Sequence, residues 1–216
     1  MKLKNKIRAI NKPDLPFHLD ILEIDKVMDG SSYEMGKLES TNGTMNAKNV
    51  RFSEVHIKGV NFGEGQLPFS TWLDVIFEKC DLSNVKLKGA RFNRVEFREC
   101  KLVGVDFDEA IMRDVQFIDC PAPYSLFNLT DLGDVRFDDC LLKEANFIEA
   151  TFDNVQFGAS AIQEVQFSDT SLRNVDLSQC QFTFIHVKED DLRGAIISPE
   201  QAITLIEVFG LEVKHD

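Results

Sequence analysis

The chain has 216 residues, of which 44% are hydrophobic and 28% charged, and its formal net charge is -12. This acidic balance argues against direct contact with nucleic acid, because phosphate binding needs clustered Lys and Arg. No run of about 18 apolar residues predicts a membrane span. A protein of the cytoplasm is therefore expected.

The first 49 residues do not share the periodicity that follows them. Residues 1–12 carry five basic side chains and no acid, and they lack the apolar core of a secretory signal peptide. The stretch "DLPFHLDILEIDKVM" could form one or two strands, and the polar stretch after it is rich in turn residues. We predict an N-terminal cap or a degenerate coil over residues 1–49. The five bases are Lys2, Lys4, Lys6, Arg8 and Lys12.

From residue 52 to residue 197 the sequence has a period of five. All thirty positions of this series are large and apolar except Ala122, and fourteen of them are Phe. A smaller residue lies two positions before most of these centres. Period five fits neither an α-helix, at 3.6, nor a strand, at 2. We predict a chain that turns a corner every five residues, closes a coil after four corners and points both residues inward.

A second recurrence, at every twentieth position, supports this prediction, because same-face residues of successive coils would then stack. The stretch "DVQFIDC" at 114–120 is followed by "DVRFDDC" at 134–140. Phenylalanines at 77, 97, 117, 137 and 157 form one column of this spacing. Residues 50–197 are thus predicted to form an all-β solenoid with four faces.

Four stretches of this region resemble the motif A(D/N)Lxx of the pentapeptide-repeat family: "CDLSNVKLKGARF", "TDLGDVRFDDC", "EANFIEATF" and "TSLRNVDLSQC". The resemblance covers residues 50–197 and implies a right-handed quadrilateral β-helix. With coils at strand spacing, about 4.8 Å, the repeats would stack into a rod of roughly seven and a half coils.

Residues 198–216 are predicted to cap the open end of the solenoid with an α-helix, since an unpaired last coil would leave backbone groups bare. Ser198 is the expected N-cap, Pro199 the first helical residue and Gln201 the partner of Ser198 in a capping box. Gly210 is the expected stop. The helical face expected to close the last coil consists of Ala202, Leu205, Ile206 and Phe209.

The last residues, "LEVKHD", alternate like a short strand. The dimeric, fluoroquinolone-resistance-associated branch of the pentapeptide-repeat family ends in a similar helix and strand. This resemblance implies a homodimer formed through the C-terminus, with Leu211 and Val213 at the interface.

All cysteines fall in one column of the twenty-position recurrence. A zinc site needs four ligands around one point, whereas this column would place sulfurs in a line at about 4.8 Å intervals. We interpret these residues as small core residues, and a disulfide or redox role is the less favoured alternative. They are Cys80, Cys100, Cys120, Cys140 and Cys180.

No catalytic constellation is recognisable. The four histidines, at 18, 56, 186 and 215, lie in no spacing typical of a triad, a zinc site or a phosphate loop. We therefore expect no enzyme, no metal and no cofactor. Pro121 and Pro123 flank Ala122, and Gly63, Gly65 and Pro68 crowd another turn, so both stretches are expected to bulge or kink. Either could be a tolerated turn or a projecting loop for a partner.

Negative charge is concentrated in one part of the repeat region. Residues 106–169 contain 14 acids and 3 bases, whereas residues 50–105 contain 7 acids and 9 bases. The acidic part would carry roughly one net charge per 1.4 Å of rod, close to the value of about one per 1.7 Å for duplex DNA. Rows of like charges on adjacent strands cost stability.

Members of the pentapeptide-repeat family bind type II topoisomerases as DNA mimics, and the resemblance implies DNA gyrase or topoisomerase IV as partner. The hypothesis is that the acidic rod modulates such an enzyme or its sensitivity to fluoroquinolones. The alternative, which stays open, is a protein-interaction scaffold with no topoisomerase role. The acids expected to contact the partner are Asp106, Asp108, Glu109, Asp114, Asp119, Asp131, Asp134, Asp138, Asp139, Glu144 and Glu149.

Overall fold

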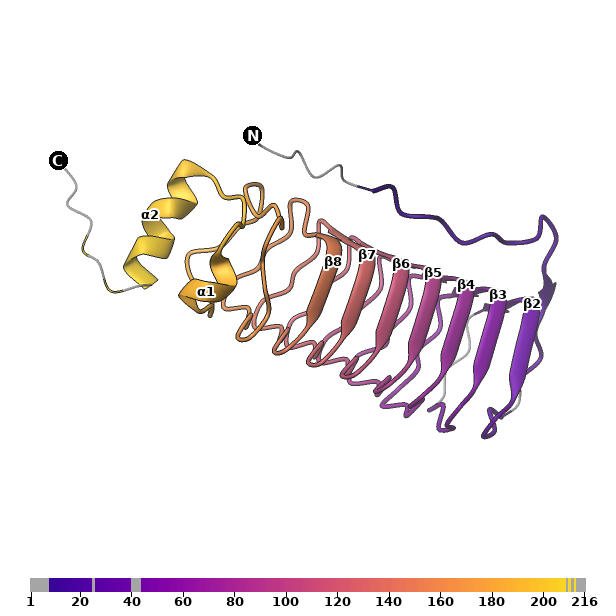
Figure 1. The fold of residues 1–216 in the computed structure, drawn as a ribbon. Coiled ribbons are helices and arrows are strands. Elements are labelled where there is room, and N and C mark those ends of the chain that lie inside the picture. Colours follow the sequence, from indigo (N-terminus) through magenta and orange to yellow (C-terminus); the bar gives the residue numbers. More distant parts are fainter. Residues whose placement is uncertain (1–7, 25, 40–43, 209, 211, 213–216) are drawn as a thin grey trace.

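A computed structural model describes residues 8–24, 26–39, 44–208, 210 and 212. Eight parallel strands form one sheet in sequence order, and the chain winds through them as a β-solenoid (Figure 1). The first two strands are β1 (Asp20–Ile21) and β2 (Ser32–Glu39). The other six are β3 (Arg51–Lys58), β4 (Thr71–Glu78), β5 (Arg91–Arg98), β6 (Ile111–Ile118), β7 (Asp131–Asp138) and β8 (Thr151–Gln156).

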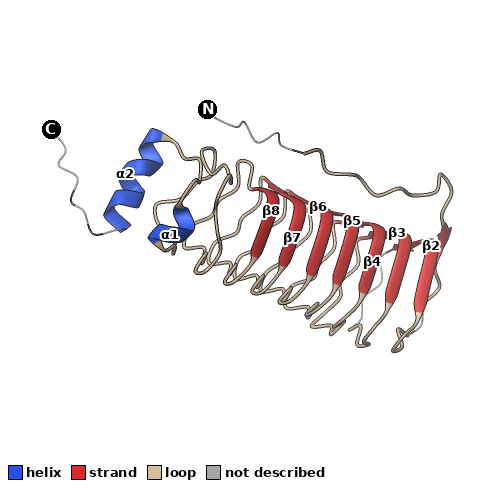
Figure 2. Ribbon diagram, in the orientation of Figure 1, coloured by secondary structure: helices blue, strands red, loops and turns tan. Residues whose placement is uncertain are grey.

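Successive coils are offset by twenty positions, as the recurrence predicts. Val75 pairs with Val95, and the same offset continues through β8. Isolated bridges such as Asp81 with Lys101 extend the pairing onto the faces that carry no regular strand. The fold is the quadrilateral β-helix expected from the sequence. Helices are confined to the C-terminal end of the solenoid (Figure 2).

The N-terminal segment contributes β2, which pairs with β3 so that Tyr33 lies beside Phe52. The solenoid pairing therefore extends one coil before residue 50, in a coil that is one position shorter than the others. The chain before β1 leaves the solenoid and runs back along its outside towards the C-terminal half (Figure 1).

A left-handed residue marks nearly every corner of the coil. It lies two positions after the apolar centre, and Asp114, Asp119 and Asp134 adopt φ values of 55°, 52° and 56° there. Asn and Asp tolerate this conformation better than other side chains, and Gly adopts it without strain. Asp, Asn and Gly suit these corners, although Glu and several other residues also occupy them.

Two interleaved stacks of phenylalanine rings run through the middle coils of the core. Phe97, Phe117 and Phe137 stack nearly face to face, with centroids 4.8 Å and 4.7 Å apart. A second stack contains Phe107 and Phe127, 5.0 Å apart, and its rings meet the first stack edge-on. These rings are fully buried, so each coil contributes large apolar area and specific ring geometry to the next.

The cysteine column lies in the core, and all five thiols are free. The backbone N–H of Cys80 lies 3.5 Å from the Cys100 sulfur, and the thiol of Cys120 donates to the carbonyl of Phe97. Ser160 continues the column and accepts from the N–H of Cys140 at 3.0 Å. Burial raises the pKa of Cys180 to about 12, which keeps that thiol protonated and unreactive.

The expectation that the proline stretches bulge or kink is wrong. Pro121 pairs with Leu141, and the carbonyls of Pro121 and Pro123 accept from the N–H groups of Leu102 and Gly104. One coil earlier, the N–H of Lys101 donates to the carbonyl of Cys80, so the N–H at position 121 would make the equivalent bond between coils. Proline at 121 lacks this N–H. The stretch thus lacks one ladder donor and keeps its register. The stretch around Pro68 likewise keeps its pairing through Gln66.

The C-terminal cap consists of α1 (Glu189–Leu192), which the sequence analysis missed, and α2 (Pro199–Val208). The capping box is confirmed: the N–H of Ser198 donates to Gln201 Oε1 at 2.9 Å, and the N–H of Gln201 donates to Ser198 Oγ at 3.2 Å. Gly210, at φ 78°, follows the helix as expected. Among the described residues, neither helix has the length and apolarity to cross a membrane.

The face that α2 turns inward differs from the expected one. Gln201 and Leu205 are buried, whereas Ala202 is half-buried and Ile206 is exposed. The cause is polar: Gln201 Nε2 donates to the carbonyls of Leu177 and Cys180, which end the last coil. Phe209, Leu211 and Val213 lie outside the described residues.

The contribution of the stacked rings to the free energy of unfolding can be tested by substitution. Phe117→Ala should lower the free energy of unfolding by about 3–5 kcal/mol, because it leaves a cavity between two stacked neighbours. Phe17→Ala, at a fully exposed site, should change it by less than about 0.5 kcal/mol. Denaturant titration followed by circular dichroism measures both. Equal stability of the two variants would contradict this account of the core.

Candidate interaction surface

The four corners of successive coils stack into four edges that run along the rod. We name them by their described corner residues: edge 1 is positions 54, 74, 94, 114, 134, 154 and 174, and edge 2 is positions 59, 79, 99, 119 and 139. Edge 3 is positions 84, 104, 124, 144 and 164, and edge 4 is positions 49, 69, 89, 109, 129, 149 and 169. Neighbours on an edge are one strand spacing, about 4.8 Å, apart.

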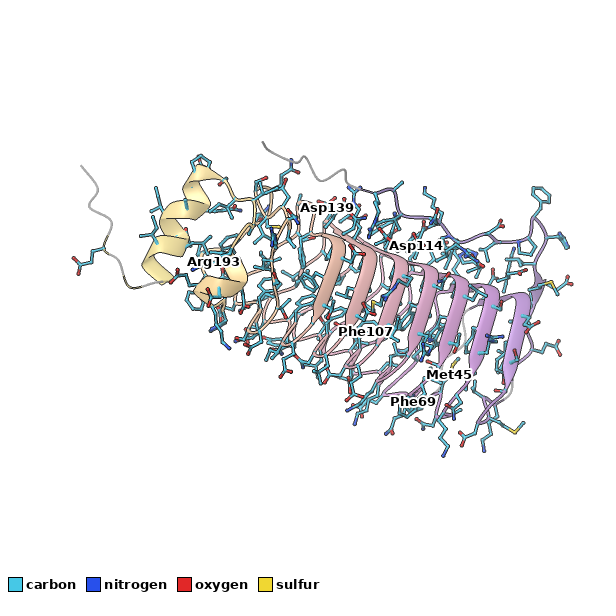
Figure 3. The ribbon with its side chains drawn as sticks, viewed as in Figure 1. Met45, Phe69, Phe107, Asp114, Asp139 and Arg193 are labelled. Atoms are coloured by element: carbon cyan, nitrogen blue, oxygen red, sulfur yellow. The ribbon has the colours of Figure 1, made fainter. Side chains whose placement is uncertain are left out.

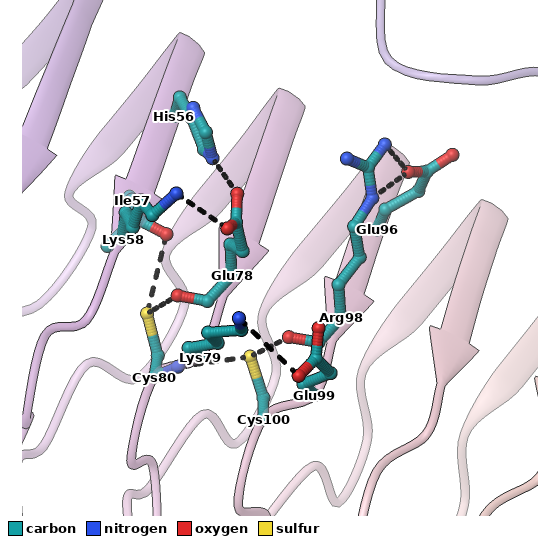
Figure 4. Close-up of polar contacts among 10 residues, drawn as sticks. All are labelled: His56, Ile57, Lys58, Glu78, Lys79, Cys80, Glu96, Arg98, Glu99 and Cys100. Atoms are coloured by element: carbon teal, nitrogen blue, oxygen red, sulfur yellow. Dashed lines mark hydrogen bonds and ion pairs between the residues drawn. The ribbon is translucent and has the colours of Figure 1, made fainter.

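In the first coils, opposite charges on the face between edges 1 and 2 are paired (Figure 4). Glu78 accepts from His56 at 3.0 Å and from Lys58 at 2.7 Å. The hydrogen bond from Lys58 lowers the pKa of Glu78 and outweighs its burial. Buried Glu96 accepts from Arg98 at 2.6 Å. This part of the rod neutralises its own charge.

The acids expected to contact a partner do not converge on one face. Seven of the eleven are corner residues and are divided among all four edges, and the other four lie between edges. Asp114 lies on edge 1 and Asp139 on edge 2; both are labelled in Figure 3. Five acids are ion-paired with a nearby base: Glu109, Asp131, Asp134, Asp138 and Glu144.

Edge 2 offers the clearest row of free carboxylates among the described residues. Asp119 and Asp139 are exposed and occur in no ion pair of that part of the chain. Glu99 precedes them on the same edge and has only a 3.7 Å contact with Lys79. Asp138, adjacent to Asp139, pairs with Arg136 at 2.6 Å. Edge 2 therefore changes from mixed to wholly acidic along the rod.

Asp108 is half-buried, unlike the exposed acids of edge 2. Burial raises the pKa of this carboxyl above its usual range, and the charge of Asp106 adds to the effect. Its oxygen accepts from the N–H of Asn128 at 2.9 Å. The Asp108 side chain thus forms a hydrogen bond between neighbouring coils.

Edge 1 is covered by a segment of the same chain, which we call the strap and define as residues 8–16. Arg8 contacts Asp134 at 2.7 Å, and Asn11 contacts Asp114 at 2.8 Å. The sequence analysis noted the basic N-terminus and the acidic rod separately and missed this contact. Their complementary charge was the available signal. Of the five bases, Lys2, Lys4 and Lys6 lie outside the described residues.

Asp74 of edge 1 holds the C-terminal part of the strap. Its side chain is 6% exposed, and it accepts from the guanidinium of Arg94 at 2.6 Å and from the N–H of Asp14 at 2.9 Å. Burial acts to raise its pKa, but these hydrogen bonds overcome it and lower the pKa below the ordinary value. The Asp74 carboxylate is therefore held ionised.

A metal ion or a small ligand would need grouped ligating side chains or a hollow. Among the residues that the structure describes, no three His, Cys, Asp or Glu side chains are grouped to hold a metal ion. An open hollow of about 550 Å³ lies where α2 meets the last coil, lined by Gln163, Cys180 and Gln201 among others. It lies at the C-terminal cap.

Comparison with known proteins places this geometry in a family. A model described as a pentapeptide repeat region matches residues 70–147, 90–167 and 130–198, which together make up more than half of the chain. No curated protein matches the chain.

Several solved structures are similar to the chain. One is a trypsin-treated variant of QnrB1, a plasmid-mediated fluoroquinolone resistance protein, at 20% identity and a TM-score of 0.39 over 87% of this chain and 99% of that one. Another is HetL, involved in heterocyst differentiation regulation in the cyanobacterium Nostoc sp. strain PCC 7120. It is 15% identical, with a TM-score of 0.35 over 78% of this chain and 90% of that one.

The Asp74–Arg94 pair predicts a pH dependence. Arg94→Met should cost about 2 kcal/mol at pH 7, because it leaves a nearly buried carboxylate without its main partner. A carboxyl with a lowered folded pKa stabilises above its unfolded pKa, about 3.9, and this contribution is lost as the pH falls through the folded value. The cost should therefore shrink below about pH 4. Unfolding titrations between pH 7 and pH 2 measure it.

Arg91→Met provides the control for this prediction, because Arg91 is an exposed residue of the same strand. Its substitution should change stability by less than about 0.5 kcal/mol at every pH. A cost of Arg94→Met that stays constant down to pH 2 would show that the pair does not depend on ionised Asp74.

Proposed function

We propose that this chain, which belongs to the pentapeptide-repeat family, is a non-enzymatic binding protein whose acidic rod occupies the DNA-binding surface of a type II topoisomerase, gyrase or topoisomerase IV. Binding would modulate the activity of the enzyme or its sensitivity to fluoroquinolones. The single observation that carries the proposal is the row of exposed carboxylates Asp119 and Asp139 on edge 2, which form no ion pair with any residue that the structure describes.

The spacing and rigidity of that row support the proposal. The two carboxylates lie on adjacent coils, one strand spacing of about 4.8 Å apart, on corners fixed at φ 52° and 50°. Rigid anions at regular intervals resemble a phosphate backbone in linear charge. A basic saddle would attract such a rod over long range, and salt would weaken the attraction.

Fold alone does not require this arrangement of charge. The corner needs a residue that tolerates positive φ, and Asn84, Gly104 and Asn154 meet that need without charge. Two exposed carboxylates about 5 Å apart repel by roughly 0.8 kcal/mol in water. The acidic row costs stability that neutral corner residues would avoid, and a binding role accounts for that cost.

A second candidate function is a protein-interaction scaffold with no topoisomerase role. The distribution of acids over four edges, five of them already ion-paired, favours this alternative, because a mimic of DNA needs free charge on one side. Phe69, Tyr124 and Leu129 are exposed on edges 3 and 4 and offer apolar contacts instead. Solubility would then explain the acidity.

Gyrase supercoiling tests the first candidate. The purified protein should inhibit the enzyme, or protect it from a fluoroquinolone, and the effect should fade at high salt. Asp119→Asn with Asp139→Asn should weaken the effect about tenfold, because charge pairs at an interface contribute on the order of a kcal/mol each. Asn tolerates the corner conformation, so folding should persist.

The matched control is Glu23→Gln with Glu64→Gln, which removes two exposed charges outside the acidic part of the rod. This variant should act like the original protein. Equal loss in both variants would indicate a general charge effect. No effect of the original protein on gyrase or topoisomerase IV at any concentration or salt would refute the topoisomerase proposal and leave the scaffold.

We also propose that the protein forms a homodimer through its C-terminus. Exposed Ile203 and Ile206 on α2 supply apolar surface next to the final residues. Leu211→Asp with Val213→Asp should give monomers in light scattering, because two buried carboxylates cannot be accommodated in an apolar interface. A dimer that persists in this variant would place the interface elsewhere, and a monomeric original protein would remove the proposal.

A further inference from the structure

The strap contacts edge 1 with a period of three residues. The backbone N–H of Arg8 donates to Asn154 Oδ1 at 3.3 Å, and that of Asn11 donates to Asp114 Oδ1 at 2.8 Å. The N–H of Asp14 donates to Asp74 Oδ1 at 2.9 Å. The three acceptors follow one another at intervals of two coils, so every third residue of the strap meets every second residue of the edge.

Two independent spacings make this match possible. An extended polypeptide of the polyproline type has three residues per turn and advances about 3.1 Å per residue, or about 9.3 Å in three residues. Two coils at strand spacing advance about 9.6 Å. The two repeats therefore stay in step along edge 1, and one side of the extended segment presents its N–H groups to fixed side-chain oxygens.

The prolines of the strap follow the same pattern. Pro13 and Pro16 occupy positions outside the three donating residues, so their missing N–H groups cost no contact with edge 1. Proline fixes its own φ and holds the preceding residue extended. The strap is therefore preorganised for the edge.

Side chains add chemical selectivity. The guanidinium of Arg8 bridges Asp134 at 2.7 Å and Asp153 at 2.9 Å, and these bonds raise its pKa above the ordinary value. Asn154 Nδ2 also returns a bond to the Arg8 carbonyl at 3.2 Å. Asp134 and Asn154 of edge 1, with the adjacent Asp153, thus bind an arginine through both its side chain and its backbone.

We propose that edge 1 is a binding site for an extended polypeptide segment that carries an arginine and presents a backbone N–H at every third residue, and that the strap is its built-in ligand. A partner segment of the same chemistry would displace the strap. Asp114 and Asp134 also belong to the surface proposed for a topoisomerase. A bound strap would leave edge 2 as the free row, a consequence that rests on that function while the site itself does not.

Hydrogen exchange on the full chain tests the period of three. Asn11→Pro removes a donating N–H and should raise the exchange rate of the Asp14 amide about tenfold, as expected when hydrogen bonds to a charged acceptor are lost. Ala9→Pro is the matched control, because it introduces a proline at a position outside the three donors and should leave the rate unchanged. Equal rates in both variants would overturn the proposed register.

Peptide binding in trans tests the ligand class. A fluorescein-labelled peptide with the sequence of residues 8–18 should bind the Asn11→Pro protein at least about fivefold tighter than the original protein, because its own strap competes less. Adding Asp114→Gly and Asp134→Gly should abolish binding, and glycine keeps the corner conformation. Binding that survives the loss of both carboxylates, or equal affinity of the two proteins, would refute the site. No topoisomerase takes part, so failure here is distinct from failure of the proposed function.

Discussion

The offset of twenty positions between coils, kept from β3 to β8, is the constraint on which the rest of this structure depends. It fixes which side chain lies above which, because each strand pairs only with the strands one coil before and after it. The same offset aligns the phenylalanine stacks inside and the corner residues outside. A single inserted residue would move apolar centres out of the core, which explains why the proline stretches keep the count.

Much of this fold was predictable from the sequence, because a core read at every fifth position leaves a strong pattern. The columns at every twentieth position predicted the stacking of Phe97, Phe117 and Phe137, and the tail predicted the capping box of Ser198. The inward face of α2 was not predictable, since it depends on carbonyls left open by the last coil, which Gln201 satisfies. The small effect of Pro121 and Pro123 on the strand register was not predictable either. It depends on which backbone N–H groups form hydrogen bonds between coils, and the sequence does not show this.

The candidate surface was less predictable than the fold. The number of acids in the rod can be read from the sequence, but the composition of a segment does not show on which edge each acid lies. Corner residues five positions apart lie on different edges of the rod. The structure divides the acids among four edges and pairs several with bases on neighbouring positions and coils, such as Asp138 with Arg136. The strap was hidden for a related reason: its partners, Asp114 and Asp134, lie more than a hundred positions away in sequence.

The strap covers acids on one edge of the rod, so the net charge of the chain does not describe how negative charge is distributed around it. An acidic rod of constant diameter would present the same potential on every side, but here edge 1 is covered by a segment bearing Arg8, and edge 2 is left with free Asp119 and Asp139. The exposed negative charge of this part of the rod therefore differs between edge 1 and edge 2. A partner that needs a row of anions would meet edge 2 first, whereas edge 1 becomes available only to a ligand that replaces both the guanidinium and the backbone donors of the strap. Under the two proposals made here for edges 1 and 2, edges built from the same repeat would select different partners.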